Sequence, residues 1–280
     1  MKNSKTIVVT GITSGFGLDF TKKMQIEGYR IIGLVRGGEI RGQRIFNNLE
    51  NIDFVEVDLK DSTSVDAAIE KVKVLACDGI DILVNNAGYG LLGPIELQTE
   101  NQIREQFEVN FFAPLKLITL LLPLLRIKRG RIINITSLVG FTTFPFYGSY
   151  AATKHALDII TESLYYELRD FGVQVCAIEP GSYKTKFSPN IELGEIDNSA
   201  YSFYKNRLDR FKVFLNLVQN KMEKDSSKVV NILSELCIKK TIPTRVQIGS
   251  DSKLMWYIKK ISPDFLRVKI QHWIYKRMFF

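Results

Sequence analysis

The chain has 280 residues, of which 45% are hydrophobic and 24% are charged. This composition excludes a disordered or collagen-like chain, and the length is sufficient for one large domain or two small ones with a sizeable core. The 38 Lys and Arg residues exceed the 30 Asp and Glu residues, so the formal net charge is +8. Residues 1–180 carry 19 basic and 21 acidic side chains, whereas residues 181–280 carry 19 and 9. The basic excess therefore lies in the last third of the chain.

Stretches rich in apolar and β-branched residues alternate along the chain with segments that have the composition of helices. The expected strands are Thr6–Thr10, Arg30–Val35, Asp53–Val57, Ile80–Val84, Arg131–Thr136, Val173–Glu179 and Arg245–Ile248. The expected helices include Phe16–Glu27, Ser62–Leu75, Glu100–Leu125 and Ser149–Asp170. Because continuous apolar strands separated by helices are typical of parallel sheets covered on both faces, the pattern predicts a doubly wound α/β (Rossmann) fold.

No repeat or linker divides the sequence, which predicts a single domain over residues 1–280. Residues 1–181 contain most of this alternation and are expected to form the α/β core. From Ser182 to about Ser226 the alternation fails and aromatic residues are mixed with charged ones. Residues 182–280 are therefore interpreted as a C-terminal elaboration of this domain, with a last strand and a basic, aromatic tail.

The cysteine pattern and the apolar runs bear on the compartment. The three cysteines match no metal-ligand or redox spacing, so they are expected to be buried thiols in a reducing cytosol, without a metal site: Cys77, Cys176 and Cys237. The most apolar run, Phe111 to Leu125, is shorter than a membrane span of roughly 20 residues, and the start of the chain lacks a signal-peptide pattern. The sequence predicts a cytoplasmic protein with Phe111–Leu125 in a buried helix.

A glycine-rich turn follows the first predicted strand and directly precedes a helix. Glycines permit a tight turn and close approach of the backbone, and a helix N-terminus attracts a pyrophosphate. Glycine-rich turns also occur without ligands, but the position between the first strand and the first helix makes this a much stronger dinucleotide-binding signal. The residues expected to contact the cofactor here are Gly11, Thr13, Ser14, Gly15, Phe16 and Gly17.

The end of the second strand bears on the choice between NADP and NAD. A carboxylate usually stands there when a site binds an unmodified ribose, but this chain has Val35 and Arg36. Because arginine suits a 2′-phosphate, NADP is favoured over NAD, although Arg36 could also be a solvated loop residue. After the third strand, Asp58 is expected to accept a hydrogen bond from the adenine, with Leu59 beside it. After the fourth strand, Asn85, Ala87 and Gly88 are expected to lie against the cofactor.

Three side chains form a candidate reactive set. Tyr150 and Lys154 are four residues apart on one predicted helix, so both side chains reach a common ligand. The Lys154 ammonium, together with the positive charge of the cofactor, is expected to lower the pKa of the phenol, which is about 10 in a free tyrosine. Ser137, at the end of the fifth strand, is expected to donate a hydrogen bond to a substrate carbonyl oxygen. His155 is expected to face away from this set.

With Thr-Gly-x-x-x-Gly-x-Gly, Asn-Asn-Ala-Gly and Tyr-x-x-x-Lys in this order, the chain resembles the short-chain dehydrogenase/reductase family over about residues 5–185. Phe16 and Thr136 are minor departures from the family pattern. The resemblance implies that Tyr150 is the general acid or base, that Lys154 holds the nicotinamide ribose, and that Asn110 supports a proton relay. It further implies a homodimer or homotetramer, and a nicotinamide contact formed by Pro180, Gly181 and Thr185.

Two further interpretations concern the long helix and the last third of the chain. Because Pro114 has no N–H, the carbonyl of Asn110 is expected to be free to hold a relay water; the alternative is a kink required only by packing. The resemblance implies a cofactor-binding and catalytic core in residues 1–181 and a substrate lid in residues 182–280. The large apolar residues of this lid predict a lipophilic substrate, unless they serve only to pack the lid: Phe187, Tyr201, Phe203, Tyr204, Phe211, Phe214 and Leu215. The basic tail over residues 251–280 suits peripheral contact with an anionic bilayer, or docking onto the protein or a partner subunit. No motif for nucleic-acid binding accompanies the charge.

Together these features predict an NADP(H)-dependent oxidoreductase that acts on a carbonyl group or a secondary alcohol of a lipophilic small molecule. The family resemblance implies a substrate of the steroid, retinoid or long-chain carbonyl type. Two alternatives come from other classes: an NADP-binding sensor or scaffold without turnover, and a membrane-associated lipid-binding protein.

Overall fold

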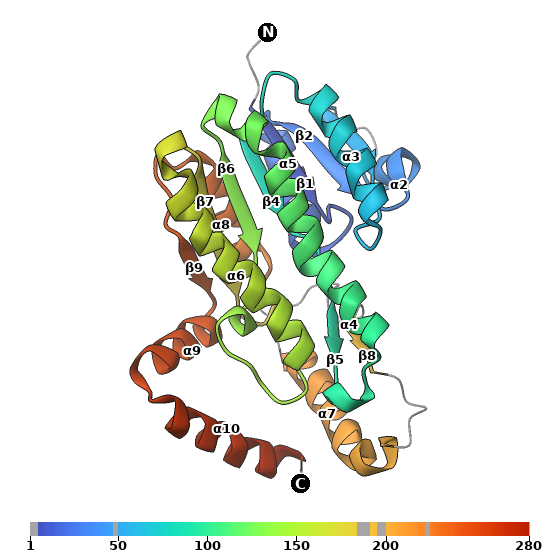
Figure 1. Cartoon of the computed structure of the whole chain (residues 1–280), viewed down its shortest axis with the longest axis vertical. Helices are drawn as coiled ribbons and strands as arrows, with labels where there is room; N and C mark the ends of the chain where they lie inside the picture. Colours follow the sequence, from blue (N-terminus) through green and yellow to red (C-terminus); the bar gives the residue numbers. More distant parts are fainter. Residues whose placement is uncertain (1–4, 47–49, 184–190, 195–199, 222–224, 280) are drawn as a thin grey trace.

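The computed structural model describes residues 5–46, 50–183, 191–194, 200–221 and 225–279. Its main sheet has seven parallel strands in the order β3-β2-β1-β4-β6-β7-β9 (Figure 1). The strands are β1 (Thr6–Thr10), β2 (Arg30–Val35), β3 (Ile52–Glu56), β4 (Ile82–Asn85), β6 (Arg131–Ile135), β7 (Gln174–Pro180) and β9 (Arg245–Ile248). The order reverses between β1 and β4, which is where ligands bind in doubly wound sheets.

Helices cover both faces of this sheet. On one face, α3 (Ser62–Leu75), α5 (Ala113–Lys128) and α6 (Gly148–Leu168) bury their apolar side chains against the strands. On the other face, α1 (Gly15–Ile26) and α8 (Ser227–Ile238) do the same. The two faces therefore have separate hydrophobic cores, and the predicted doubly wound α/β fold is confirmed.

The long apolar segment forms a continuous helix with a local irregularity. Helix α4 (Glu100–Phe107) begins with a capping box between Thr99 and Gln102, and a π-helical turn (Glu108–Phe112) joins it to α5. The stretch Glu100–Lys128 is long and apolar enough to cross a membrane by length and composition. However, its buried side chains pack against the sheet, as expected for the core helix of a globular protein.

Several elements were not predicted from the sequence. Helix α2 (Gly38–Ile45) follows β2, and a second sheet pairs β5 (Gly90–Leu92) in parallel with β8 (Ile191–Leu193). The region where the alternation fails contains α7 (Tyr201–Lys221), a helix whose aromatic and charged residues are mixed along its length. A three-residue strand has too few positions to show a period, and a mixed helix shows only a weak one.

The chain ends in two helices, α9 (Ser250–Ile261) and α10 (Asp264–Phe279), which extend away from the sheet (Figure 1). Helix α10 packs against α7 and α9. We call residues 250–279 the α9–α10 arm. The prediction of three buried cysteines is wrong for Cys77, which is exposed just after the end of α3, while Cys176 and Cys237 are buried.

Candidate active site

A cavity of about 1280 Å³ lies at the carboxyl ends of the central strands. Loops that follow β1, β2, β3, β4, β6 and β7 contribute to its wall, and the outer wall comes from α7, α9 and α10. Pockets for a single drug-sized ligand occupy about 300–1000 Å³, so this volume suits two ligands side by side. In the described part of the chain, no cluster of His, Cys, Asp or Glu residues has an arrangement suited to a metal ion.

The turn between β1 and α1 has the geometry of a phosphate cradle. Gly11 and Gly15 have positive φ angles of 71° and 55°, which side chains rarely adopt. A Cβ atom on Gly17 would lie 2.3 Å from the Gly11 carbonyl oxygen, so glycine is required at this position for packing. The side chain of Ser14, the N-cap residue, does not cap α1 with a hydrogen bond, and the first turn has no acidic residue. A pyrophosphate therefore fits at this helix N-terminus.

The loop after β4 is fastened to this turn. The Thr10 hydroxyl accepts hydrogen bonds from the backbone N–H groups of Asn86 and Ala87, at 3.0 Å each. The Asn86 amide donates to the carbonyl oxygens of Thr10 and Gly11, at 3.0 and 3.1 Å. Asn86 also lines the cavity, which was not predicted from the sequence.

The structure does not bring every predicted cofactor residue to the cavity wall. Asn85 is buried and donates a 2.8 Å hydrogen bond to the Asn134 side chain, so it points into the core. Gly17 does not line the cavity either; it packs against the backbone of Gly11 within the turn. Thr185 and Phe187 lie outside the described residues. The other predicted cofactor residues line the cavity: Gly11, Thr13, Ser14, Gly15, Phe16, Arg36, Asp58, Leu59, Ala87, Gly88, Tyr150, Lys154, Pro180 and Gly181.

Two arginines line the cavity near the carboxyl end of β2. Arg36 follows β2 directly, and Arg41 donates a 3.2 Å hydrogen bond from its guanidinium to the Arg36 carbonyl oxygen. Both side chains are exposed and line the cavity. On the neighbouring loop, Asp58 accepts a 3.0 Å hydrogen bond from the Lys60 N–H, which fixes the carboxylate against its own loop.

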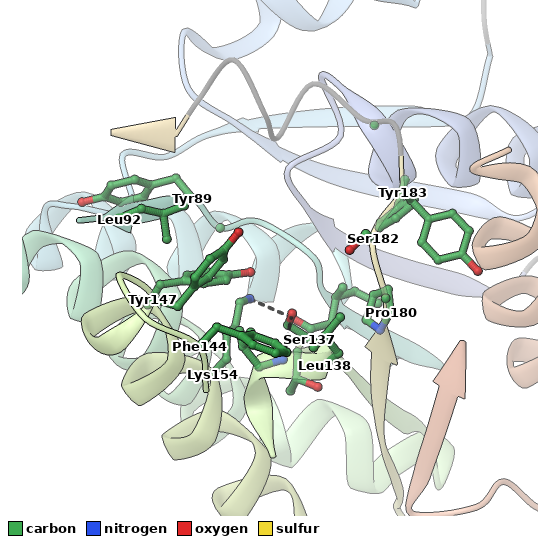
Figure 2. A pocket seen from close by; sticks show the side chains of 18 of the residues that line it. Tyr89, Leu92, Ser137, Leu138, Phe144, Tyr147, Lys154, Pro180, Ser182 and Tyr183 are labelled. Atoms are coloured by element: carbon green, nitrogen blue, oxygen red, sulfur yellow. Dashed lines mark hydrogen bonds between the residues drawn. The ribbon is translucent and has the colours of Figure 1, made fainter. Parts of the chain in front are cut away.

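The predicted reactive set lies together in the cavity. Tyr150 and Lys154 come from the first turns of α6, and Ser137 follows β6. Ser137 makes a side-chain hydrogen bond with the Tyr150 phenol. The Lys154 ammonium donates a 2.9 Å hydrogen bond to the Ile135 carbonyl oxygen, and Figure 2 shows its side chain beside Ser137. His155 lines no part of the cavity and bonds instead to the Ala151 carbonyl, as expected for a structural histidine.

Burial governs the protonation of this set. Burial raises the pKa of Tyr150 above its ordinary value, and the hydrogen bond with Ser137 lowers that pKa by less. Lys154 is not among the causes of this shift, so the lowering expected from Lys154 together with the positive charge of the cofactor stays a prediction. Burial also lowers the pKa of Lys154 to about 8. At neutral pH the phenol is thus protonated and able to donate a proton, and the lysine is charged.

Asn110 lies in the π-helical turn and is fully buried. Its amide oxygen accepts a 3.1 Å hydrogen bond from the Tyr89 N–H, and its amide nitrogen donates to the Tyr89 carbonyl and the Thr153 hydroxyl, at 2.9 and 3.1 Å. Thr153 donates in turn to the carbonyl oxygen of Tyr150. Asn110 therefore links the loop after β4 to α6 and does not itself line the cavity.

The loop after β7 closes against the arm. A Cβ atom on Gly181 would lie 2.1 Å from a carboxylate oxygen of Asp251, so only glycine fits there. The other carboxylate oxygen of Asp251 accepts a 2.7 Å hydrogen bond from the Ser182 N–H. Because Pro180 and Gly181 line the cavity, Asp251 on α9 fixes the backbone of a predicted cofactor contact.

Aromatic and aliphatic side chains form the remaining wall beside Ser137. Figure 2 shows Tyr147 and Phe144 beside this pocket, on the side of α6. Tyr147 was not predicted, and burial raises its pKa to about 12. From the predicted lid, Phe211, Phe214 and Leu215 line the cavity, whereas Phe203 is exposed and Tyr204 bonds to Glu96 outside it. The adjoining arm contributes Leu254, Met255, Ile258, Ile270 and Ile274.

The sequence and the fold of this chain are similar to those of known proteins. A family model described as short chain dehydrogenase matches residues 5–195. The chain is 30% identical to human retinol dehydrogenase 16 over 285 aligned residues, covering 96% of this chain and 88% of the relative. It is 29% identical to 3-ketodihydrosphingosine reductase of Bacteroides thetaiotaomicron, covering 87% of each. A short-chain dehydrogenase structure from Streptomyces avermitilis superposes with a TM-score of 0.80 at 28% identity, over 97% of this chain and 96% of that one.

Proposed function

The chain belongs to the short-chain dehydrogenase/reductase family, so it is an oxidoreductase that uses a nicotinamide cofactor, and we propose that it couples NADP(H) to the reduction of a lipophilic carbonyl compound or to the reverse oxidation. The observation that carries the proposal is the hydrogen-bonded Ser137–Tyr150 pair in a cavity that joins a phosphate cradle to an apolar wall. When bound, the nicotinamide supplies or accepts the hydride.

Ser137 and Tyr150 are suited to act on the substrate oxygen. In the reductive direction the Ser137 hydroxyl holds that oxygen, and Tyr150 donates its proton as negative charge develops there. The raised pKa of Tyr150 keeps the phenol protonated at neutral pH, as this role requires. Lys154, charged below about pH 8 and tied to the end of β6, is placed to hold the nicotinamide ribose.

Arg36 and Arg41 support the choice of NADP. Both line the cavity where the adenosine ribose is expected, at the end of β2. A 2′-phosphate gains charge-assisted hydrogen bonds from guanidinium groups. Val35 and Arg36 occupy the place where a carboxylate would bind the unmodified ribose of NAD.

The apolar wall supports a lipophilic substrate. The wall beside Ser137 is formed mainly by aromatic and aliphatic side chains of α7 and the α9–α10 arm. An apolar wall of this kind favours long or bulky hydrocarbon groups. The names of two relatives, a retinol dehydrogenase and a ketodihydrosphingosine reductase, indicate substrates of the same character in those proteins.

Oxidation of NADPH by the purified protein tests the proposal, with ketones and aldehydes graded by chain length. We expect kcat/KM to rise with the length of the hydrocarbon chain, because each buried methylene contributes about 0.8 kcal/mol. Tight binding of NADPH without turnover of any carbonyl or alcohol would instead support an NADP-binding sensor. Binding of long-chain carbonyls without any binding of NADPH would support a lipid-binding protein.

A further inference from the structure

The α9–α10 arm exposes large apolar side chains that have no place in the cavity. Six such residues are 44–77% exposed and do not line the cavity, and we call them the outer face of the arm: Tyr257, Ile261, Phe265, Leu266, Val268 and Trp273. Six large, exposed apolar side chains within two consecutive helices make the outer face a candidate interaction surface.

The same arm is strongly basic. Residues 250–279 contain seven Lys and Arg residues and two aspartates. Both aspartates are already engaged, Asp251 with the Ser182 N–H and Asp264 with Arg267. Two cations lie over the indole rings of the arm, Lys260 at 4.9 Å from the Trp256 ring centre and Arg277 at 4.3 Å from that of Trp273. The arm therefore presents apolar and positively charged groups side by side.

This combination favours one occupant. A second copy of the arm would bring two equally basic surfaces together, and like charges at an interface are unfavourable. An anionic bilayer supplies both complements, because its headgroups attract lysine and arginine and its interface accommodates Trp, Tyr and Phe side chains. We propose that the α9–α10 arm docks on an anionic lipid bilayer through its outer face.

Docking would also place the cavity against the lipid. Leu254, Ile270 and Ile274 line the cavity and are 60%, 49% and 43% exposed, so they lie where the cavity opens along the arm. A lipophilic substrate dissolved in the bilayer then enters between α9, α10 and α7 without crossing water. This second step rests on the proposed function, whereas the docking rests on the surface alone.

Tryptophan fluorescence gives a direct test, because the only two tryptophans of the chain, Trp256 and Trp273, both lie in the arm. In a Trp256→Phe variant, Trp273 on the outer face is the single reporter. The full-length variant is titrated with vesicles of phosphatidylcholine plus phosphatidylglycerol, and with vesicles of phosphatidylcholine alone. We expect a blue shift and co-sedimentation with the anionic vesicles, much less with the neutral ones, and a decrease at high salt.

Three results would overturn the proposal: no shift and no co-sedimentation with anionic vesicles, equal salt-independent binding to both vesicle types, or a concentration-dependent shift without vesicles that accompanies dimerisation. The third would assign the outer face to a second copy of the chain.

Matched variants separate the outer face from the rest of the surface. Phe265→Ser with Val268→Ser removes apolar groups, and Lys269→Glu with Lys276→Glu reverses charge. The controls are Val74→Ser and Lys71→Glu on α3, where Val74 is 76% exposed. We expect each arm variant to weaken vesicle binding about tenfold or more, and the controls to bind like the parent. Unchanged binding by both arm variants would contradict the proposal.

The same variants keep docking distinct from catalysis. Circular dichroism reports folding, and turnover of a short, water-soluble carbonyl is expected to be unchanged because the substituted residues do not line the cavity. Turnover of a long-chain carbonyl supplied in anionic vesicles is expected to fall with vesicle binding. If no carbonyl is turned over by the parent protein, the proposed function fails while the vesicle result still decides the docking.

Discussion

Lys154 donates a hydrogen bond of 2.9 Å from its ammonium nitrogen to the carbonyl oxygen of Ile135, the last residue of β6. This bond connects α6 to the carboxyl end of β6, where the cavity lies. Ile135 precedes Ser137 by two residues. A lysine buried in this way is held in one place, and the same burial lowers its pKa to about 8. Its charge therefore changes within an accessible pH range.

The first prediction concerns this titration. A lysine whose pKa is lowered is charged below that pKa and neutral above it, so kcat/KM for NADPH is expected to fall as the pH rises through about 8. The raised pKa of Tyr150 places its own deprotonation at higher pH. In Lys154→Arg, whose guanidinium stays protonated, the overall rate is expected to be lower but the decline near pH 8 should be absent. An identical decline in that variant would assign it to another group.

The second prediction concerns the cofactor. Arg36→Ala is expected to weaken NADPH binding by about tenfold or more, through loss of charge-assisted hydrogen bonds, with little effect on NADH. Isothermal titration with both cofactors measures this difference. Arg44→Ala is the control, because Arg44 is exposed on α2 and does not line the cavity. Equal losses for NADPH and NADH would mean that Arg36 does not select the phosphate.

The third prediction concerns stability. Arg245 on β9 pairs with Asp158 at 2.8 Å and Glu162 at 2.6 Å on α6, and the Asp158 side chain is only 5% exposed. Arg245→Met leaves Asp158 buried without its cation, which costs about 3–5 kcal/mol of unfolding free energy. In the exposed pair Arg104–Glu100, Arg104→Met is expected to cost less than about 1 kcal/mol. Urea unfolding compares the two, and similar losses would contradict this account.

The sequence predicted those features that depend on local pattern. The central strands are continuous apolar runs, and the glycine-rich turn and the Tyr150–Lys154 spacing are short motifs with a defined geometry, so all of them were found. It was not predictable that Asn86, and not Asn85, would line the cavity. The Asn85 side chain donates to Asn134 in the core, whereas that of Asn86 donates to the turn between β1 and α1. That choice depends on strands far apart in the chain.

Other parts depended on tertiary packing. Helix α7 mixes aromatic and charged residues, so its sequence shows only a weak helical period. Which of its side chains line the cavity is decided by tertiary packing. The burial that raises the pKa of Tyr150 was not predicted, because the spacing to Lys154 is visible in the sequence and the burial of the phenol is not. The relay proposed at Asn110 stays a prediction, although the π-helical turn lies next to Pro114.

The central claim is that Tyr150 donates the proton in an NADPH-dependent carbonyl reduction. It is tested most directly by the rate of NADPH oxidation by Tyr150→Phe, with the best carbonyl substrate of the graded series. Tyr147→Phe is the matched control, because Tyr147 lines the same cavity one helical turn away. We expect Tyr150→Phe to lose about 10²–10⁴-fold in kcat with unchanged affinity for NADPH, and Tyr147→Phe to stay within about tenfold of the parent. A Tyr150→Phe protein that turns over like the parent would contradict the account.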